Sequence, residues 1–220
     1  MPVDQAIFTS INRRGKSGYQ LASRSPGVTE SEATALTKWC PSHGALNGDR
    51  ANCVSVNFHG LPGGRYALSR TCEGPPEYSG RGGRQVFTRA VLVDPETYRR
   101  SGHRPFLLYR DALALGHLTY VAAPEPALPC PTLSSYYPPR ARGAPIAFAR
   151  EMNLGVFDGL LNQIQAGQPV VVAYDGDRTA FAESLLERIE ESCLRDLSFT
   201  TSLLPSSVRP YQISVVPPGR

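Results

Sequence analysis

The chain has 220 residues, of which 41% are hydrophobic and 19% charged, and its formal net charge is +4. This composition excludes a disordered chain and leaves room for one large domain or two small ones. The net charge is too mild for a nucleic-acid-binding protein, and no apolar run approaches the roughly 20 residues of a membrane helix. We therefore expect neither nucleic acid nor a membrane as a partner.

The five cysteines are widely spaced and include no CxxC pair, which a disulfide framework or a zinc ribbon would need. Cys53 and Cys72 lie in predicted strands, which favours buried apolar roles over a nucleophilic role beside His59. The first residues lack the basic and apolar segments of a signal peptide. We expect a cytoplasmic protein and predict no metal site, no cofactor and no catalytic residue.

Alternating apolar residues in the first half of the chain predict an antiparallel sheet. Residues 6–11 and 19–23 should pair as a hairpin, whose turn contains Arg13, Arg14 and Lys16. Further strands are predicted at residues 53–58, 65–71 and 85–93. The last of these is the longest and most apolar, so we expect it in the interior of the sheet.

Three helices are predicted in this half of the chain. Thr29 and Glu32 have the spacing of a capping box, which predicts a helix that ends near Trp39. Asp94, followed by a proline, predicts a short helix over residues 95–100. Residues 112–118 are expected to be helical as well.

Seven prolines between Pro124 and Pro145 rule out a helix or a central strand there. We interpret residues 123–145 as an extended connection, which Tyr136 and Tyr137 attach to one domain. Residues 1–122 then form an N-terminal domain, and residues 146–220 form a second, smaller one.

After the connection the hydrophobic period becomes that of a helix. The pattern predicts a helix from residue 152 to a cap at Gly167, a buried strand at 170–174 and an amphipathic helix at 179–193. Two strands at 197–201 and 211–216 complete an α-β-α-β-β unit. The predicted fold class is therefore α+β: a mainly antiparallel sheet domain with few helices, followed by a small α/β domain.

The segment 78–84 is the most distinctive loop, because it contains three glycines and two arginines and leads into the most apolar strand. It is either a strand connection with solvated arginines or a nest of backbone N–H groups that binds an anion. Together with the first hairpin turn it gives the predicted residues for binding a protein partner or an anion. These are Arg13, Arg14, Tyr78, Arg81, Gly82, Gly83 and Arg84.

Two other motifs suggest phosphate or metal chemistry. Gly15-Lys16-Ser17 ends like a phosphate-binding P-loop, but the required earlier glycine is missing and the segment is a hairpin turn, so we reject this assignment. Asp175 and Asp177 follow the buried strand of the second domain. They either shape a turn and cap a helix or offer carboxylates to Mg²⁺.

Several short segments, in their order along the chain, resemble the N-terminal domain (type 2) of the bacterial GTPase-associated protein 1 family. They are residues 8–20, 25–27, 65–71, 78–83 and 87–90. Residues from about 152 to 216 are similar to the middle domain of that family. The resemblance implies a partner or adaptor component of conflict or signalling systems, with no established catalytic residues. The family's further C-terminal region is absent here, which predicts that the chain is the front part of a longer protein.

We predict a non-enzymatic interaction module whose partner is a GTPase or another protein of the same system. Two alternatives stay open. One is a nucleotide- or anion-binding, enzyme-like domain that uses the Gly80–Arg84 loop with Asp175. The other is a surface for single-stranded nucleic acid, in which Tyr19, Tyr66 and Tyr78 lie among the arginines. The sequence predicts no oligomeric state.

Overall fold

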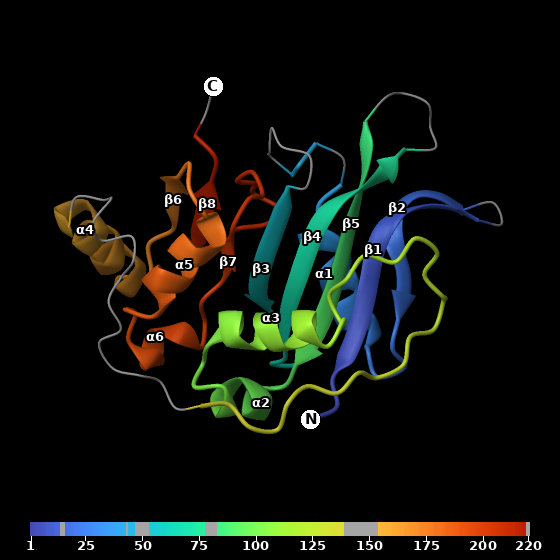
Figure 1. Cartoon of the computed structure of the whole chain (residues 1–220), viewed down its shortest axis with the longest axis horizontal. Helices are drawn as coiled ribbons and strands as arrows, with labels where there is room; N and C mark the ends of the chain where they lie inside the picture. The colour runs from blue at the N-terminus through green and yellow to red at the C-terminus, as the bar shows by residue number, and fades with distance from the viewer. Residues whose placement is uncertain (14–15, 43, 47–52, 78–82, 139–153, 219–220) are drawn as a thin grey trace.

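The structure is a computed structural model that describes residues 1–13, 16–42, 44–46, 53–77, 83–138 and 154–218. In these residues eight strands form one sheet, and helices lie on both of its faces (Figure 1). The strands are β1 (Asp4–Arg13), β2 (Lys16–Arg24), β3 (Val54–Gly60), β4 (Tyr66–Pro76), β5 (Arg84–Val93), β6 (Val170–Ala173), β7 (Phe199–Thr200) and β8 (Ile213–Val216). The helices are α1 (Glu30–Trp39), α2 (Pro95–Arg100), α3 (Pro105–Ala114), α4 (Leu154–Gln165), α5 (Arg178–Leu186) and α6 (Glu191–Leu194). The predicted α+β class is confirmed.

The strand order is β2-β1-β5-β4-β3-β7-β8-β6. Pairing is antiparallel from β2 through β7, and β7, β8 and β6 are parallel to one another. The N-terminal part is therefore a mainly antiparallel sheet, as predicted. β5 lies in its interior between β1 and β4, also as predicted, but with 10 residues it is shorter than the 11-residue β4.

The two helices predicted from capping residues have the expected bounds. Thr29 Oγ1 accepts a hydrogen bond from Glu32 N at 3.3 Å, and Glu32 Oε2 accepts one from Thr29 N at 3.0 Å, which forms the capping box of α1. Asp94 Oδ1 accepts a hydrogen bond from Thr97 N at 2.8 Å and caps α2. Local hydrogen bonds fix these two helix starts, so nearby sequence was sufficient to predict them.

Other boundaries differ from the prediction. The helix expected at residues 112–118 is wrong, because α3 begins at Pro105, in the first helical turn, and the chain leaves it before Gly116, whose φ is +78°. The helix expected at 179–193 is interrupted: α5 ends at Leu186, Ile189 enters the core, and α6 begins at Glu191. The first hairpin turn is also tighter than expected, since Arg13 already pairs with Lys16.

The sheet has an apolar core on each face, because successive side chains of a strand point to opposite sides. On one face Val91 and Val93 of β5 pack in the large core that includes residues of α2, α3 and α5. On the other face Ala90 and Leu92 pack with Leu36 of α1. Figure 1 shows α2, α3 and α5 in front of the sheet and α1 behind it.

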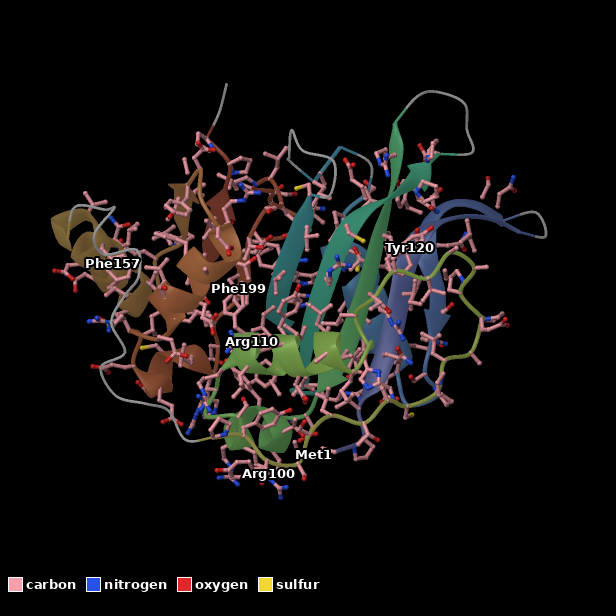
Figure 2. All side chains as sticks on the ribbon, in the orientation of Figure 1. Met1, Arg100, Arg110, Tyr120, Phe157 and Phe199 are labelled. Carbon is pink, nitrogen blue, oxygen red and sulfur yellow. The ribbon has the colours of Figure 1, made fainter. Side chains whose placement is uncertain are left out.

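The short strand β7 joins the two parts of the sheet through both faces. On the front, the buried ring of Phe199 stacks on Phe106 with a centroid distance of 4.8 Å, and Figure 2 shows it near the middle of the molecule. On the back, Asn57 Oδ1 accepts hydrogen bonds from Thr200 at 2.7 Å and Ser55 at 2.8 Å. Asn57 Nδ2 donates to the Thr71 hydroxyl at 3.1 Å. All of these polar side chains are buried.

The described part of the connection, residues 124–138, runs along the N-terminal half of the molecule. Leu133 N donates to Met1 O at 2.9 Å, and the Tyr137 hydroxyl donates to Asp111 Oδ2 at 2.8 Å, whereas Tyr136 is 75% exposed. The sheet itself continues from β3 into β7. The division into residues 1–122, 123–145 and 146–220 stays a prediction.

Candidate functional site

The two glycine- and arginine-bearing loops lie at one end of the antiparallel sheet, which we call the loop end (Figure 1). It is the end at which β1 passes into β2 and β4 passes into β5. Antiparallel pairing places Thr9 of β1 opposite Phe87 of β5, so the end of β1 and the start of β5 lie at this same end of the sheet.

Hydrogen bonds tie the stems of these two loops together. The Tyr19 hydroxyl of β2 accepts a hydrogen bond from Val86 N at 3.0 Å, and Thr9 Oγ1 donates to Val86 O at 3.1 Å. The Gln85 side-chain amide donates to Ser10 O. The first hairpin and the start of β5 are therefore held as one structural unit.

The described part of the second loop has the backbone that the glycines predicted. Gly83 has a φ of +119°, a conformation that side-chain-bearing residues rarely adopt. Glu77 N donates to Gly83 O at 3.1 Å and closes the stem, just beyond a shift in the β4–β5 register between Glu73 and Pro76. Such irregular strand ends redirect the chain at the edge of a binding surface.

Arg84 is the described arginine of this loop. Its side chain is 55% exposed, and its Nε lies 3.2 Å from Oε2 of Glu73, which is 26% exposed. Exposed ion pairs of this kind contribute little to stability, typically below about 1 kcal/mol. The pair therefore leaves Arg84 able to exchange Glu73 for an acidic partner.

A small hollow lies beneath the loop end, between the stems and the connection. Its volume is about 170 Å³, and its lining includes Asn12, Gln85, Phe87, Val121 and Pro124. Tyr120 stands beside it, with its ring 4.9 Å from that of Phe87 (Figure 2). Sites for nucleotides and drug-sized ligands usually measure several hundred Å³, so this hollow suits a single side chain.

The predicted site residues are only partly described. Gly83 and Arg84 lie together at the loop end. Arg13 is the last residue of β1, and its side chain is outside the described part. Arg14, Tyr78, Arg81 and Gly82 lie outside the described residues. Binding by this set of residues stays a prediction.

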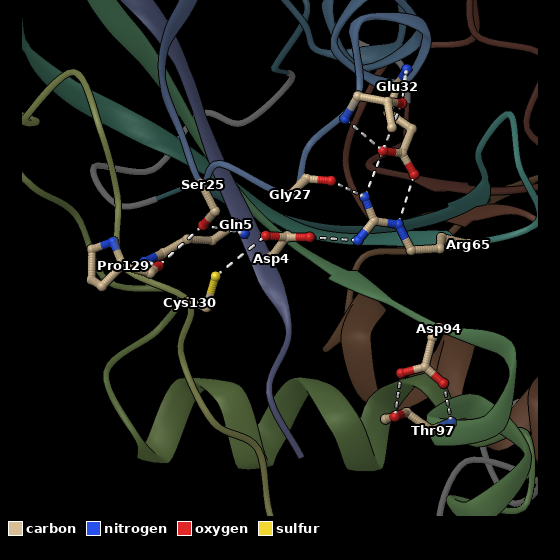
Figure 3. A network of polar contacts seen from close by, with 11 residues as sticks. Asp4, Gln5, Ser25, Gly27, Glu32, Arg65, Asp94, Thr97, Pro129 and Cys130 are labelled. Carbon is tan, nitrogen blue, oxygen red and sulfur yellow. Dashed lines mark hydrogen bonds and ion pairs between the residues drawn. The ribbon is translucent and has the colours of Figure 1, made fainter.

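Other arginines that the sequence placed near these loops have structural roles elsewhere. Arg65 lies at the opposite end of β4, which we call the base. Its guanidinium donates to Glu32 at 2.7 and 2.5 Å, to Asp4 Oδ2 at 2.6 Å and to Gly27 O at 3.0 Å (Figure 3). Burial raises the pKa of the Glu32 carboxyl, but hydrogen bonds from Arg65 and Thr29 outweigh this and hold the pKa below its usual value.

The base is closed further by neighbours of Asp4. A side chain at Gly27 would overlap the Asp4 carboxylate, so only glycine fits there without a shift. Pro129 O in the connection accepts a hydrogen bond from Gln5 Nε2 at 2.8 Å (Figure 3). Arg89 also contributes to structure, because it donates to Gln5 Oε1 at 2.7 Å. Local spacing in the sequence gave no signal for these long-range contacts.

A family model described as GTPase-associated protein 1, N-terminal domain type 2, matches residues 2–134, which is more than half of the chain. The chain belongs to this family. The matched residues include β1 to β5 and α1 to α3, hence both the loop end and the base. Neither the curated proteins nor the solved structures give a match.

In this member of the GTPase-associated protein 1 family, the remaining candidate groups have structural explanations. Burial raises the pKa of the Cys53 and Cys72 thiols, which disfavours the reactive thiolate. Burial also lowers the pKa of His59 to about 4, and its ring stacks on Trp39 at 4.2 Å. Asp177 Oδ1 accepts hydrogen bonds from two backbone N–H groups at 3.0 Å and caps α5, as predicted.

Two searches of the described ranges complete the description of this family member. Within those ranges, no group of three or more His, Cys, Asp and Glu side chains could hold a metal ion. Among the helices in those ranges, none has the length and apolar character needed to cross a membrane.

Proposed function

We propose that the chain is a non-enzymatic adaptor module that associates with a GTPase of a bacterial conflict or signalling system, in the cytoplasm. The observation that carries this proposal is the family match over residues 2–134, since the family is described as GTPase-associated. The GTPase supplies the chemistry in this proposal, and the module supplies a binding surface.

The contact surface in this proposal is the loop end, with the residues Arg13, Arg14, Tyr78, Arg81, Gly82, Gly83 and Arg84. Three features support it: the stems are fixed by Gln85 and Tyr19, Arg84 is exposed, and its Glu73 contact is weak. Arginine and tyrosine are enriched in interface cores, and guanidinium forks suit carboxylates on an acidic partner. A stem held in place lowers the entropy lost on binding.

The enzyme-like alternative has less support. It requires the Gly80–Arg84 loop and Asp175 to converge on one ligand. Asp175 follows β6, and the strand order places β6 five positions away from β5, roughly 24 Å at the usual spacing of paired strands.

The nucleic-acid alternative also has less support. Tyr66 stacks on the core residue Phe58 at 5.3 Å, and the Tyr19 hydroxyl is engaged by Val86 N. These two rings are therefore not arranged as a platform for bases.

The experiment is an affinity purification of the full-length protein from its native host, followed by mass spectrometry of the retained proteins. We expect a GTPase to be retained, and the double variant Arg81→Ala with Arg84→Ala to lose it by at least about tenfold. The matched control is Arg188→Ala with Arg195→Ala, because both arginines are exposed and lie beside α6 in the other part of the molecule.

Thermal unfolding of each variant checks that loss of the partner is not loss of the fold. Retention of the GTPase by both double variants would remove the loop end from the proposal. Recovery of nucleic acid or a nucleotide without a protein partner would contradict the adaptor role itself.

A further inference from the structure

The strand β2 forms one outer edge of the sheet, so one side of its backbone faces away from all the other strands. The connection pairs with this edge at one point. Arg24 N donates to Pro126 O at 3.4 Å, and Leu128 N donates to Arg24 O at 3.1 Å, which forms a parallel bridge between Arg24 and Ala127. The edge is thus already able to add a strand.

The connection then leaves the edge. Within the described part of the chain, residues 20–23 pair through their main chain with β1 and with no other strand. Exposed N–H and C=O groups on an edge strand are a template for pairing with another extended segment. Natural sheets usually cover such an edge or twist it away.

A groove runs beside this part of β2, with a volume of about 560 Å³. One wall is the β2 edge with Leu21 and Ser23, the other is α1 with Ala33 and Thr34, and Pro126 belongs to the lining as well. A groove between an edge strand and a helix is the geometry in which peptides are bound as an added strand.

The groove contains a polar group that lacks a partner. Ser23 is 2% exposed, and its buried hydroxyl has no hydrogen-bond partner among the described residues. Buried polar groups are almost always hydrogen-bonded, and leaving one unpaired is unfavourable. A backbone or side-chain group of an incoming segment could satisfy it.

The charges of the groove are unequal at its two ends. At the Arg24 end, the guanidinium of Arg24 is paired with Glu30, the first residue of α1. At the other end Lys38, in the last turn of α1, is exposed and has no ion-pair partner among the described residues. The groove therefore offers one uncompensated cation, which favours a ligand with a carboxylate.

We propose that the edge of β2 accepts an extended acidic peptide as an additional strand of the sheet. Main-chain hydrogen bonds to residues 20–23 hold the peptide, its alternate side chains enter the groove against α1, and an acidic residue pairs with Lys38. This surface lies away from the loop end and goes beyond the proposed GTPase contact.

The test uses a fluorescent synthetic peptide in which valine alternates with threonine and two glutamates stand at one end. Binding to the full-length protein is followed by anisotropy, and hydrogen exchange reports which backbone amides become protected. We expect binding, with new protection in residues 20–23. N-methylation of alternate peptide nitrogens should weaken binding by at least about tenfold, because it removes main-chain donors.

Two variants locate the peptide. Thr34→Trp places a large ring in the groove from an exposed position on α1 and should weaken binding by at least about tenfold. Lys38→Glu should weaken it by about fivefold and favour a peptide with lysines in place of the glutamates. The matched control for charge is Arg188→Glu, an exposed position at the end of α5, which should leave binding unchanged.

Each other outcome overturns the proposal. Absence of binding up to about 1 mM peptide would exclude the site. Equal binding of the N-methylated peptide, or protection confined to other amides, would exclude strand addition at β2. Protection of residues 20–23 that appears with protein concentration and without peptide would assign the edge to a second copy of the chain. Retention of peptide binding by the Arg81→Ala and Arg84→Ala double variant is expected, so the two proposals can fail separately.

Discussion

The two ends of β4 each have an arginine beside them, and the two arginines differ in almost every respect. Arg65 directly precedes the strand at the base, where two carboxylates and a backbone carbonyl accept hydrogen bonds from it. Arg84 lies opposite Pro76, the last residue of the strand, and makes one contact of 3.2 Å with Glu73. The first side chain is 22% exposed and the second is 55% exposed.

The difference shows that the neighbouring carboxylates, and not the arginine itself, decide which role an arginine has. At the base, Glu32 is buried and belongs to the capping box of α1, so its charge requires a partner inside the fold. At the loop end, Glu73 is partly solvated and can lose its partner at little cost. One arginine therefore stabilises the fold, and the other is available to a partner protein.

The largest expected effect sharpens this comparison directly. Arg65→Ala should lower the free energy of unfolding by about 3 kcal/mol, because it leaves the buried carboxylate of Glu32 without its cation. Arg84→Ala should change it by less than about 0.5 kcal/mol. Urea unfolding of the two variants and the wild type measures both values. Equal effects would show that the two ends do not differ in the way described.

A second effect depends on pH. In the wild type the pKa of Glu32 lies below its usual value, so its contribution to stability is present above about pH 4.3 and is lost as the pH falls through the folded-state pKa. In Arg65→Ala, burial raises the pKa of the same carboxyl, which then gains a proton more readily in the folded state.

The difference in stability between wild type and Arg65→Ala should therefore shrink by about 1–2 kcal/mol between pH 7 and pH 3.5. Urea unfolding at several pH values measures it. A difference that stays constant over this range would place the energy in the packing of the arginine stem and not in its charge.

The smallest effect concerns the loop end. Tyr19→Phe removes the acceptor for Val86 N at 3.0 Å and should cost about 1 kcal/mol, with faster hydrogen exchange at the Val86 amide. Tyr136→Phe is the matched control, since Tyr136 is 75% exposed, and should change neither quantity. Unchanged exchange at Val86 in Tyr19→Phe would show that the two loop stems are held together without this bond.

Features fixed by local chemistry were predicted well from the sequence. The capping box of Thr29 and Glu32 and the Asp94 cap gave the bounds of α1 and α2, because both depend on residues three positions apart. The start of α3 was missed because Arg104 provides no side-chain cap, so only Pro105 marked it.

Features that depend on distant residues were not predicted. Arg65 and Asp4 are 61 positions apart, and no local pattern shows that they meet. The same holds for the pairing of β3 with β7, in which Asn57 lies opposite Thr200. At the candidate site, glycine spacing predicted the backbone of Gly83, whereas the ties from Gln85 and Tyr19 depend on the pairing of strands.

The position of β7 has a consequence for the order in which the protein folds during synthesis. β3 is complete by residue 60, but its second neighbour, β7, begins at residue 199. Until then the nascent chain presents β3 as an open strand edge, with Asn57 lacking the Thr200 hydroxyl that it later accepts from. Folding intermediates with such edges are prone to aggregate, so this interval is when the chain most needs the ribosome or a chaperone to shield it.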